Sequence, residues 1–268
     1  MKSPRLTFID MTDYNQALRV YWWAAVSAAL IAVGWSIVSI ARMDPSARLA
    51  VYTLMGFAAA AGFLPTRVPG TQVLISPGDV FVFLAALIYG PAAATLVAGT
   101  EALCVSYRTS RRWTSRLGGP AFQMVAIFLS ASLLSWALAR LRSGGPLGNT
   151  TLIATLFAFS AVYFFLNTMF VGAHHSLKQG VRLISHWRHT YPWTSLSYLA
   201  GASIAGFVYL ALRDRAFAVL LGVAPLVAVI FAMSRFFFKQ AEEKARAGER
   251  ISLIVNNISE VLFAFDLQ

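Results

Sequence analysis

Charged side chains are scarce in this chain of 268 residues. They make up 12% of it, whereas hydrophobic residues make up 58% and the mean hydropathy is +0.64. A soluble globular protein carries about twice that charged fraction. Apolar runs of near-membrane length recur along the chain, as expected for helices that cross a bilayer. The scarcity of charge therefore excludes the soluble classes and predicts a polytopic membrane protein with the lipid bilayer as its partner.

Cysteine and acidic residues are also few. The one cysteine, Cys104, lies inside an apolar run, so no internal disulfide can form and the thiol does not reveal the compartment. Acidic residues number 11 against 22 Lys and Arg, which gives a net charge of +11. The basic residues lie between apolar runs, as in loops beside anionic lipid, so nucleic acid is not an expected partner. Residues 1–20 are polar and lack a signal-peptide cleavage site, so the first helix is expected to be retained.

Catalytic motifs are missing from the sequence. It has no nucleophile elbow, phosphate-binding glycine loop or paired-carboxylate motif, so we expect no catalytic residue, no cofactor and no enzymatic activity in this chain. His174 and His175 are adjacent and diverge by about 100° on a helix. His186 and His189 lack a neighbouring cysteine or acid as a third ligand, so no metal site is predicted.

The apolar runs predict about eight helices. Their expected ranges are 20–41, 49–64, 77–89, 92–107, 121–138, 152–173, 193–212 and 217–233. Trp22 and Trp23 are expected as interfacial anchors of the first helix. The third and fourth predicted helices are short for a bilayer. Either they form a tilted or re-entrant pair, or their predicted boundaries are off by a few residues. The predicted fold class is an all-α, polytopic transmembrane bundle.

A charged helix is expected to follow the last apolar run and to continue into the cytoplasm. Lys239 and Glu243 are four residues apart, as are Glu242 and Arg246, which supports a helix in water. Steps of about seven residues then predict either a dimeric coiled coil, and so a homodimer, or one solvated helix with an apolar stripe. The seam would comprise Phe237, Ala241, Lys244, Gly248, Ile251, Val255, Ile258 and Leu262.

Orientation follows from the basic residues. With the amino terminus inside, most of the 22 Lys and Arg residues fall on the cytoplasmic side. An even number of helices then brings the carboxyl terminus to the same side. We therefore expect a multi-pass protein of the plasma (inner) membrane with both termini in the cytoplasm.

Four polar residues of the apolar part are candidates for ligand binding or signal coupling: Glu101, Asn167, His174 and Asp79. Glu101 lies midway along an apolar helix, where a carboxylate is costly unless it is paired or protonated. It either lines a functional site, with Asn167, His174 or Arg108 as partner, or forms a structural ion pair with Arg108, Arg111 or Arg112.

Asp79 follows Ser76 and Pro77 at a predicted helix start. Ser76 fits the capping position, Pro77 the first helical position, and Asp79 the place of the capping-box carboxylate. The alternative is that Asp79 contacts a cation or a ligand at the membrane edge.

Two stretches carry a family resemblance. The end of the chain, LIVNNISEVLFAFDLQ, resembles the start of a PAS domain. From residue 63 to 212, the segments SPGDVFVFLAALIYGP, AAATLVAGTEAL, GGPAFQMVAIFLSASL, YFFLNTMFVGA and WTSLSYLAGASIAGFVYLAL resemble, in order, the integral-membrane input domains of bacterial signalling proteins. The resemblance implies a sensor domain at 1–234, a linker helix at 235–257 and a truncated PAS start at 258–268.

The same resemblance implies a function. The chain would be a sensory input module of signal transduction, in which a small molecule or a membrane state changes helix packing. Its last transmembrane helix would pass this change to a PAS domain and to an output domain such as a histidine kinase, diguanylate cyclase or HD-type phosphohydrolase. The alternative is the substrate-binding membrane subunit of a vitamin-type transporter. The Ala24, Ala28 and Ala32 ridge and the short middle helices resemble the substrate-specific subunits of energy-coupling-factor transporters.

Overall fold

The computed structural model describes residues 10–64, 66–67, 74–75, 77–143, 148–213 and 243. The chain divides into two compact units, the first formed by residues 1–65 and 76–217 and the second by residues 66–75 and 218–268. In the second unit, β1 (Thr66–Arg67) and β2 (Leu74–Ile75) pair antiparallel, with Thr66 opposite Ile75. Glu243 is helical and exposed.

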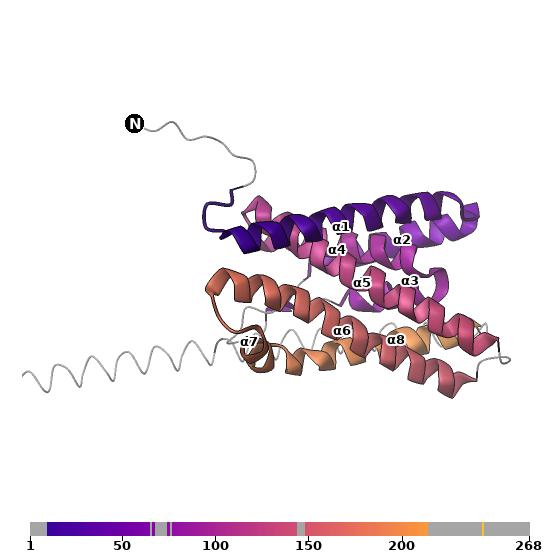
Figure 1. Ribbon diagram of the computed structural model, residues 1–268. Helices are drawn as coiled ribbons and strands as arrows, with labels where there is room; N and C mark the ends of the chain where they lie inside the picture. Colours follow the sequence, from indigo (N-terminus) through magenta and orange to yellow (C-terminus); the bar gives the residue numbers. More distant parts are fainter. Residues whose placement is uncertain are drawn as a thin grey trace, which may run out of the picture. The chain divides into compact units, whose positions relative to one another are not determined.

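The first unit is an all-α bundle (Figure 1), as the sequence predicts. Its helices are α1 (Gln16–Ala41), α2 (Pro45–Gly62), α3 (Asp79–Tyr89), α4 (Pro91–Thr109), α5 (Trp113–Arg142), α6 (Asn149–Gln179), α7 (Leu183–Thr190) and α8 (Ser195–Arg213). Four of these, α1, α5, α6 and α8, are long and apolar enough to cross a membrane. The chain is therefore a multi-pass membrane protein.

All of the first seven predicted apolar helices are present, although α5 begins at Trp113 rather than at 121 and α6 ends at Gln179 rather than at 173. The 11 residues of α3 are short for a bilayer, whereas the 19 residues of α4 are enough for about 28 Å at 1.5 Å per residue. The short helix α7 was not predicted, because its eight residues LISHWRHT do not form an apolar run. The predicted helix at 217–233, the coiled-coil seam, and the domain boundaries after 234 and 257 lie outside the described residues, apart from Glu243.

The chain reverses sharply between α3 and α4. Gly90 has a φ of +81°, a left-handed conformation that costs a glycine little, and Pro91 opens α4 with the φ that a first helical turn requires. The reversal lays α3 against α4, and α3 also packs against α2 and α8. The long helix α5 packs against α1, α4 and α6.

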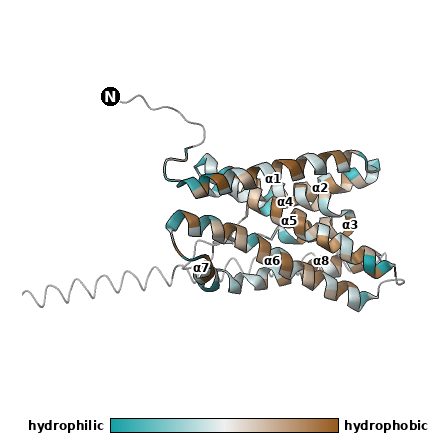
Figure 2. Ribbon diagram, viewed as in Figure 1, coloured by the Kyte–Doolittle hydropathy of each residue, from teal (hydrophilic) through white to brown (hydrophobic). Residues whose placement is uncertain are grey.

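Apolar residues cover the middle of the helices and polar residues gather near several helix ends (Figure 2). The main core joins α2, α3, α4, α5, α6 and α8 through small and branched side chains such as Val82, Ala93 and Ile127, each fully buried. A second cluster, Tyr14, Leu18 and Trp22, fixes the start of α1 against Leu117 and Leu177.

The predicted interfacial role of Trp22 is wrong. Its side chain is 0% exposed, and its Nε1 donates a hydrogen bond of 2.9 Å to the carbonyl oxygen of Thr114 on α5. Gly118 makes this possible, because a Cβ there would lie 2.5 Å from the indole nitrogen. Trp23, which is 49% exposed, keeps a position suited to an interfacial anchor.

Candidate functional site

Asp79 is the first residue of α3, and Ser76, the predicted cap of this helix, lies outside the described residues. The capping position is occupied by Gly78, and no side chain makes a capping hydrogen bond there. The helix starts after Pro77 rather than at it, so Asp79 falls in the first turn and not three residues beyond a cap. A carboxylate at this position still interacts favourably with the helix dipole. The half-buried side chain faces α8 closely, since a Cβ at Gly201 would lie 3.3 Å from the Asp79 Cβ.

Glu101 of α4 is 2% exposed, inside the bundle. Its carboxylate lies directly against Gly78, where an added Cβ would collide with it. Its backbone carbonyl lies against the end of α2, since a Cβ at Gly62 would come within 2.6 Å of that oxygen. Two glycines thus allow α2 and the start of α3 to approach the turn of α4 that carries the buried acid. Arg112, one of its predicted partners, instead forms an ion pair with Asp13.

Tyr163 of α6 completes this arrangement. The side chain is 0% exposed, and its hydroxyl interacts electrostatically with Asp79, Tyr198 and Glu101. Among the described residues, that hydroxyl has no hydrogen bond of good geometry, although the side chain of Gln123 lies close to it. The ring of Tyr163 packs edge-on against that of Tyr198, with centroids 5.4 Å apart.

Asn167 lies one turn after Tyr163 on the same face of α6. Its Nδ2 donates a hydrogen bond of 2.8 Å to the hydroxyl of Tyr198 on α8. Its Oδ1 is buried and has no hydrogen-bond partner among the described residues. The side chain therefore uses its donor within the protein and keeps its acceptor available.

We call Asp79, Glu101, Tyr163, Asn167 and Tyr198 the acidic–aromatic cluster. It joins α3, α4, α6 and α8, and brings together three of the four candidates predicted from the sequence. Tyr163 and Tyr198 were not predicted, because an uncharged tyrosine is not costly in an apolar helix in the way that a carboxylate is. Tyr163 could have been predicted from its position four residues before Asn167, which places both side chains on the same face of a helix.

His174, the fourth candidate, belongs to a different part of the bundle. It lies seven residues after Asn167, about 10 Å along α6. Its ring contacts Tyr14 and Phe122, with centroid distances of 5.7 and 5.4 Å, and His175 at 5.8 Å. Within the described part of the chain, no three His, Cys, Asp or Glu side chains are placed to hold a metal ion.

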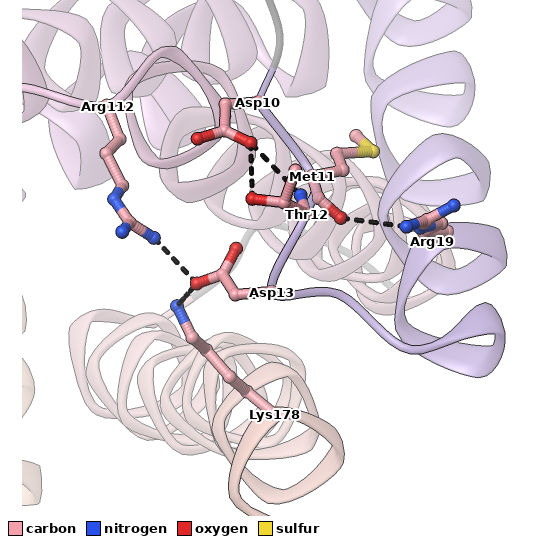
Figure 3. Close-up of polar contacts among 7 residues, drawn as sticks. All are labelled: Asp10, Met11, Thr12, Asp13, Arg19, Arg112 and Lys178. Carbon is pink, nitrogen blue, oxygen red and sulfur yellow. Dashed lines mark hydrogen bonds and ion pairs between the residues drawn. The ribbon is translucent and has the colours of Figure 1, made fainter. Parts of the chain in front are cut away.

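Asp13 forms an ion-pair centre with Arg112 and Lys178 (Figure 3). It also interacts electrostatically with His174. Its Oδ2 accepts hydrogen bonds from Lys178 at 2.9 Å and from Arg112 at 2.6 Å. The hydrogen bond from Lys178, together with that from Arg112, lowers the pKa of Asp13 to about 2. Asp13 thereby ties the segment before α1 to the end of α6 and to the turn before α5, which is a structural role.

Comparison with known proteins gives one structural likeness. No protein-family model matches the chain, and no curated protein matches it. The chain is similar to the solved structure of the S-component for biotin from an ECF-type ABC transporter, with 15% sequence identity and a TM-score of 0.45. The likeness covers 62% of this chain and 94% of that one. At this identity it concerns the fold alone.

The comparison corrects the resemblance drawn from the sequence. The similar structure is a transporter subunit, which contradicts the assignment to the sensory input domains of PAS-containing signalling proteins. The sensor, histidine kinase and diguanylate cyclase roles are withdrawn with it. The order of apolar segments misled the assignment, because short loops and small-residue helix contacts recur in unrelated membrane bundles.

Proposed function

We propose that this chain is a solute-binding membrane subunit of an uptake system for a small organic molecule, such as a vitamin. The observation that carries the proposal is the acidic–aromatic cluster. Ionisable groups inside a transmembrane bundle are costly, and they mark substrate paths by default. Five polar side chains from four helices converge here, although each helix is otherwise apolar enough to pack without them.

Two buried polar atoms of the cluster that lack hydrogen-bond partners among the described residues support the proposal that a solute binds there. A buried polar atom without a partner costs about 1–3 kcal/mol, so such atoms are rare in a finished core. The Tyr163 hydroxyl and the Asn167 Oδ1 are both in that state among the described residues. A solute that bonds to both atoms would remove this cost on binding. Small-molecule sites typically combine such a few polar groups with apolar and aromatic walls.

The orientation of the bundle is part of the proposal. Arg112 and Lys178 both pair with Asp13, so the start of α1, the turn before α5 and the end of α6 share one end of the bundle. That end also carries most basic residues of the described helices and of the turns between them: Arg19, Arg108, Arg111, Arg112, Arg116, Lys178, Arg182 and Arg188. The positive-inside tendency favours a cytoplasmic location for this end and for the amino terminus. A reporter at residue 1 found outside the cell would contradict this orientation.

The proposal is tested by solute binding to the full-length chain in detergent. Water-soluble vitamins and their precursors are screened for a rise in the melting temperature, and hits are titrated against Asn167→Ala and a control, Asn149→Ala, whose side chain is exposed at the start of α6. We expect at least one solute whose affinity falls about tenfold in Asn167→Ala and stays unchanged in the control, since a buried hydrogen bond is lost. If no solute binds, or if hits bind both variants alike, the proposed function is wrong.

A further inference from the structure

We infer that α7 lies on the membrane surface and binds the headgroups of anionic phospholipids, with Arg182 and Arg188 as the residues that contact the phosphates. This lipid site is separate from the acidic–aromatic cluster, so the inference does not depend on the proposed function. It draws on the position of α7 beside α6, on the side of α7 that is fixed to the bundle, and on the side chains that α7 leaves exposed.

The end of α6 reaches beyond the apolar part of a bilayer, and α7 packs beside that end. The 31 residues of α6 extend over about 46 Å, whereas the hydrocarbon core of a bilayer is about 30 Å thick. At Gly180 the chain turns back with a φ of +69°, a conformation typical of helix ends. A Cβ added at Gly172 would lie 3.5 Å from the Leu183 side chain and 3.8 Å from that of Trp187. The helix α7 therefore lies level with the last turns of α6, where headgroups surround the bundle.

One side of α7 is fixed to the bundle. The Trp187 Nε1 donates a hydrogen bond of 2.9 Å to the Oγ1 of Thr168 on α6. The indole ring also contacts Phe164 and Phe165, with centroid distances of 6.0 and 5.9 Å. Leu183 lies one turn before Trp187, so both side chains face α6 together. These contacts fix the rotation of α7 about its axis and thereby determine which of its residues face outwards.

A second flank of α7 carries apolar and basic side chains together. Ile184 is 57% exposed, and Val181, just before the helix, is 43% exposed. Arg182 and Arg188 are also exposed, and neither forms an ion pair with a described residue. Ile184 and Arg188 are four residues apart and share one side of the helix. Helices that lie on a membrane combine such groups, because the apolar side chains enter the acyl boundary while the basic ones stay among the headgroups.

The chemistry of this flank favours an anionic phospholipid over other sources of phosphate. A guanidinium binds a phosphate through two parallel hydrogen bonds, and two neighbouring guanidinium groups favour a headgroup with a net negative charge. Phosphatidylcholine offers the same phosphate, but its choline group cancels the charge. A soluble phosphate would pair with the arginines and leave Ile184 and Val181 in water, whereas a phospholipid covers these two side chains with its acyl chains.

Lipid titration of the full-length protein in a neutral detergent tests the site. Phosphatidylglycerol, phosphatidylcholine and glycerol 3-phosphate are added separately, and the apparent affinity is taken from the rise in melting temperature. The variant Arg182→Gln/Arg188→Gln is compared with Arg42→Gln/Arg142→Gln, which removes two exposed arginines from the other ends of α1 and α5 and so changes the net charge equally. Ile184→Gln provides a second test of the same flank.

We expect phosphatidylglycerol to stabilise the wild type and to bind Arg182→Gln/Arg188→Gln about tenfold or more weakly, since each arginine near an anionic surface adds to the attraction. The affinity should also fall in Ile184→Gln and should stay unchanged in the control. The variants should fold, because the replaced side chains are exposed and the Arg182 side chain makes no capping hydrogen bond.

Three results would overturn the inference. In the first, phosphatidylcholine or glycerol 3-phosphate stabilises the protein as well as phosphatidylglycerol does. In the second, phosphatidylglycerol binds Arg182→Gln/Arg188→Gln as tightly as it binds the wild type. In the third, the control variant loses as much affinity as Arg182→Gln/Arg188→Gln, which would show that the lipid responds to net charge and not to α7.

Discussion

At the scale of single residues, the missing side chain of Gly78 leaves room for the Glu101 carboxylate in the cluster. Gly78 has an ordinary right-handed backbone conformation, with φ −68° and ψ −22°, so its value lies in the missing side chain and not in conformational freedom. The space that a Cβ would take at this position is occupied by the carboxylate of Glu101. The position of the buried acid therefore depends on a residue outside its own helix.

Gly78→Ala should displace the Glu101 carboxylate, and with it the rest of the cluster, and weaken solute binding by about tenfold. Gly148→Ala is a matched control, because Gly148 also occupies the capping position of a helix and no atom lies within 4 Å of a Cβ added there. Both variants share the small cost of alanine at a cap. Calorimetric titration of both variants compares them, and equal affinities would show that the packing of Gly78 does not position Glu101.

At the scale of elements, the apolar runs were sufficient to predict seven helices, because lipid-facing helices must be continuous and apolar. The same criterion could not find α7, because its residues LISHWRHT mix apolar with polar and basic side chains. The start of α3 was also misplaced, since the local cap pattern at Ser76 gave no information about the close approach of Glu101 to Gly78. Contacts between segments that are distant in the sequence, and not local helix propensity, determine where α7 forms and where α3 starts.

The ion-pair centre at Asp13 links the segment before α1 to the end of α6 and to the turn before α5. We expect the stability that this ion-pair centre gives the protein to depend on pH. The pKa of Asp13 lies at about 2, below its ordinary value of 3.8, so its contribution is present above about pH 4 and is lost as the pH falls towards 2. Asp13→Asn should lower the free energy of unfolding by less than about 1 kcal/mol at neutral pH, because the side chain is 36% exposed.

The difference between wild type and Asp13→Asn should shrink when melting temperatures are measured at about pH 3 and again in high salt. Asp44→Asn, an exposed control at the start of α2, should show no such convergence. A difference for Asp13→Asn that stayed constant with pH and salt would mean that Asp13 acts through packing rather than charge.

At the scale of the whole molecule, the sequence predicted the class of protein correctly and its role wrongly. Composition determines that the chain spans a membrane, because scarce charge and recurrent apolar runs leave no other stable arrangement. The role depends on which side chains meet inside the bundle. Glu101 was recognisable as a costly residue from its position alone, but its neighbours Tyr163 and Tyr198 come from helices that are distant in the sequence.

The most direct test of a solute site in the cluster is the removal of one oxygen atom. Tyr163→Phe deletes a buried hydroxyl that has no well-formed hydrogen bond among the described residues, and Tyr52→Phe makes the same change at a side chain that is 55% exposed. Calorimetry of both variants with the solute found by screening should show Tyr163→Phe binding about three- to tenfold more weakly, with the free protein as stable as the wild type or more so. Tyr52→Phe should change neither quantity. A Tyr163→Phe protein that is less stable when free and binds the solute with unchanged affinity would contradict the account.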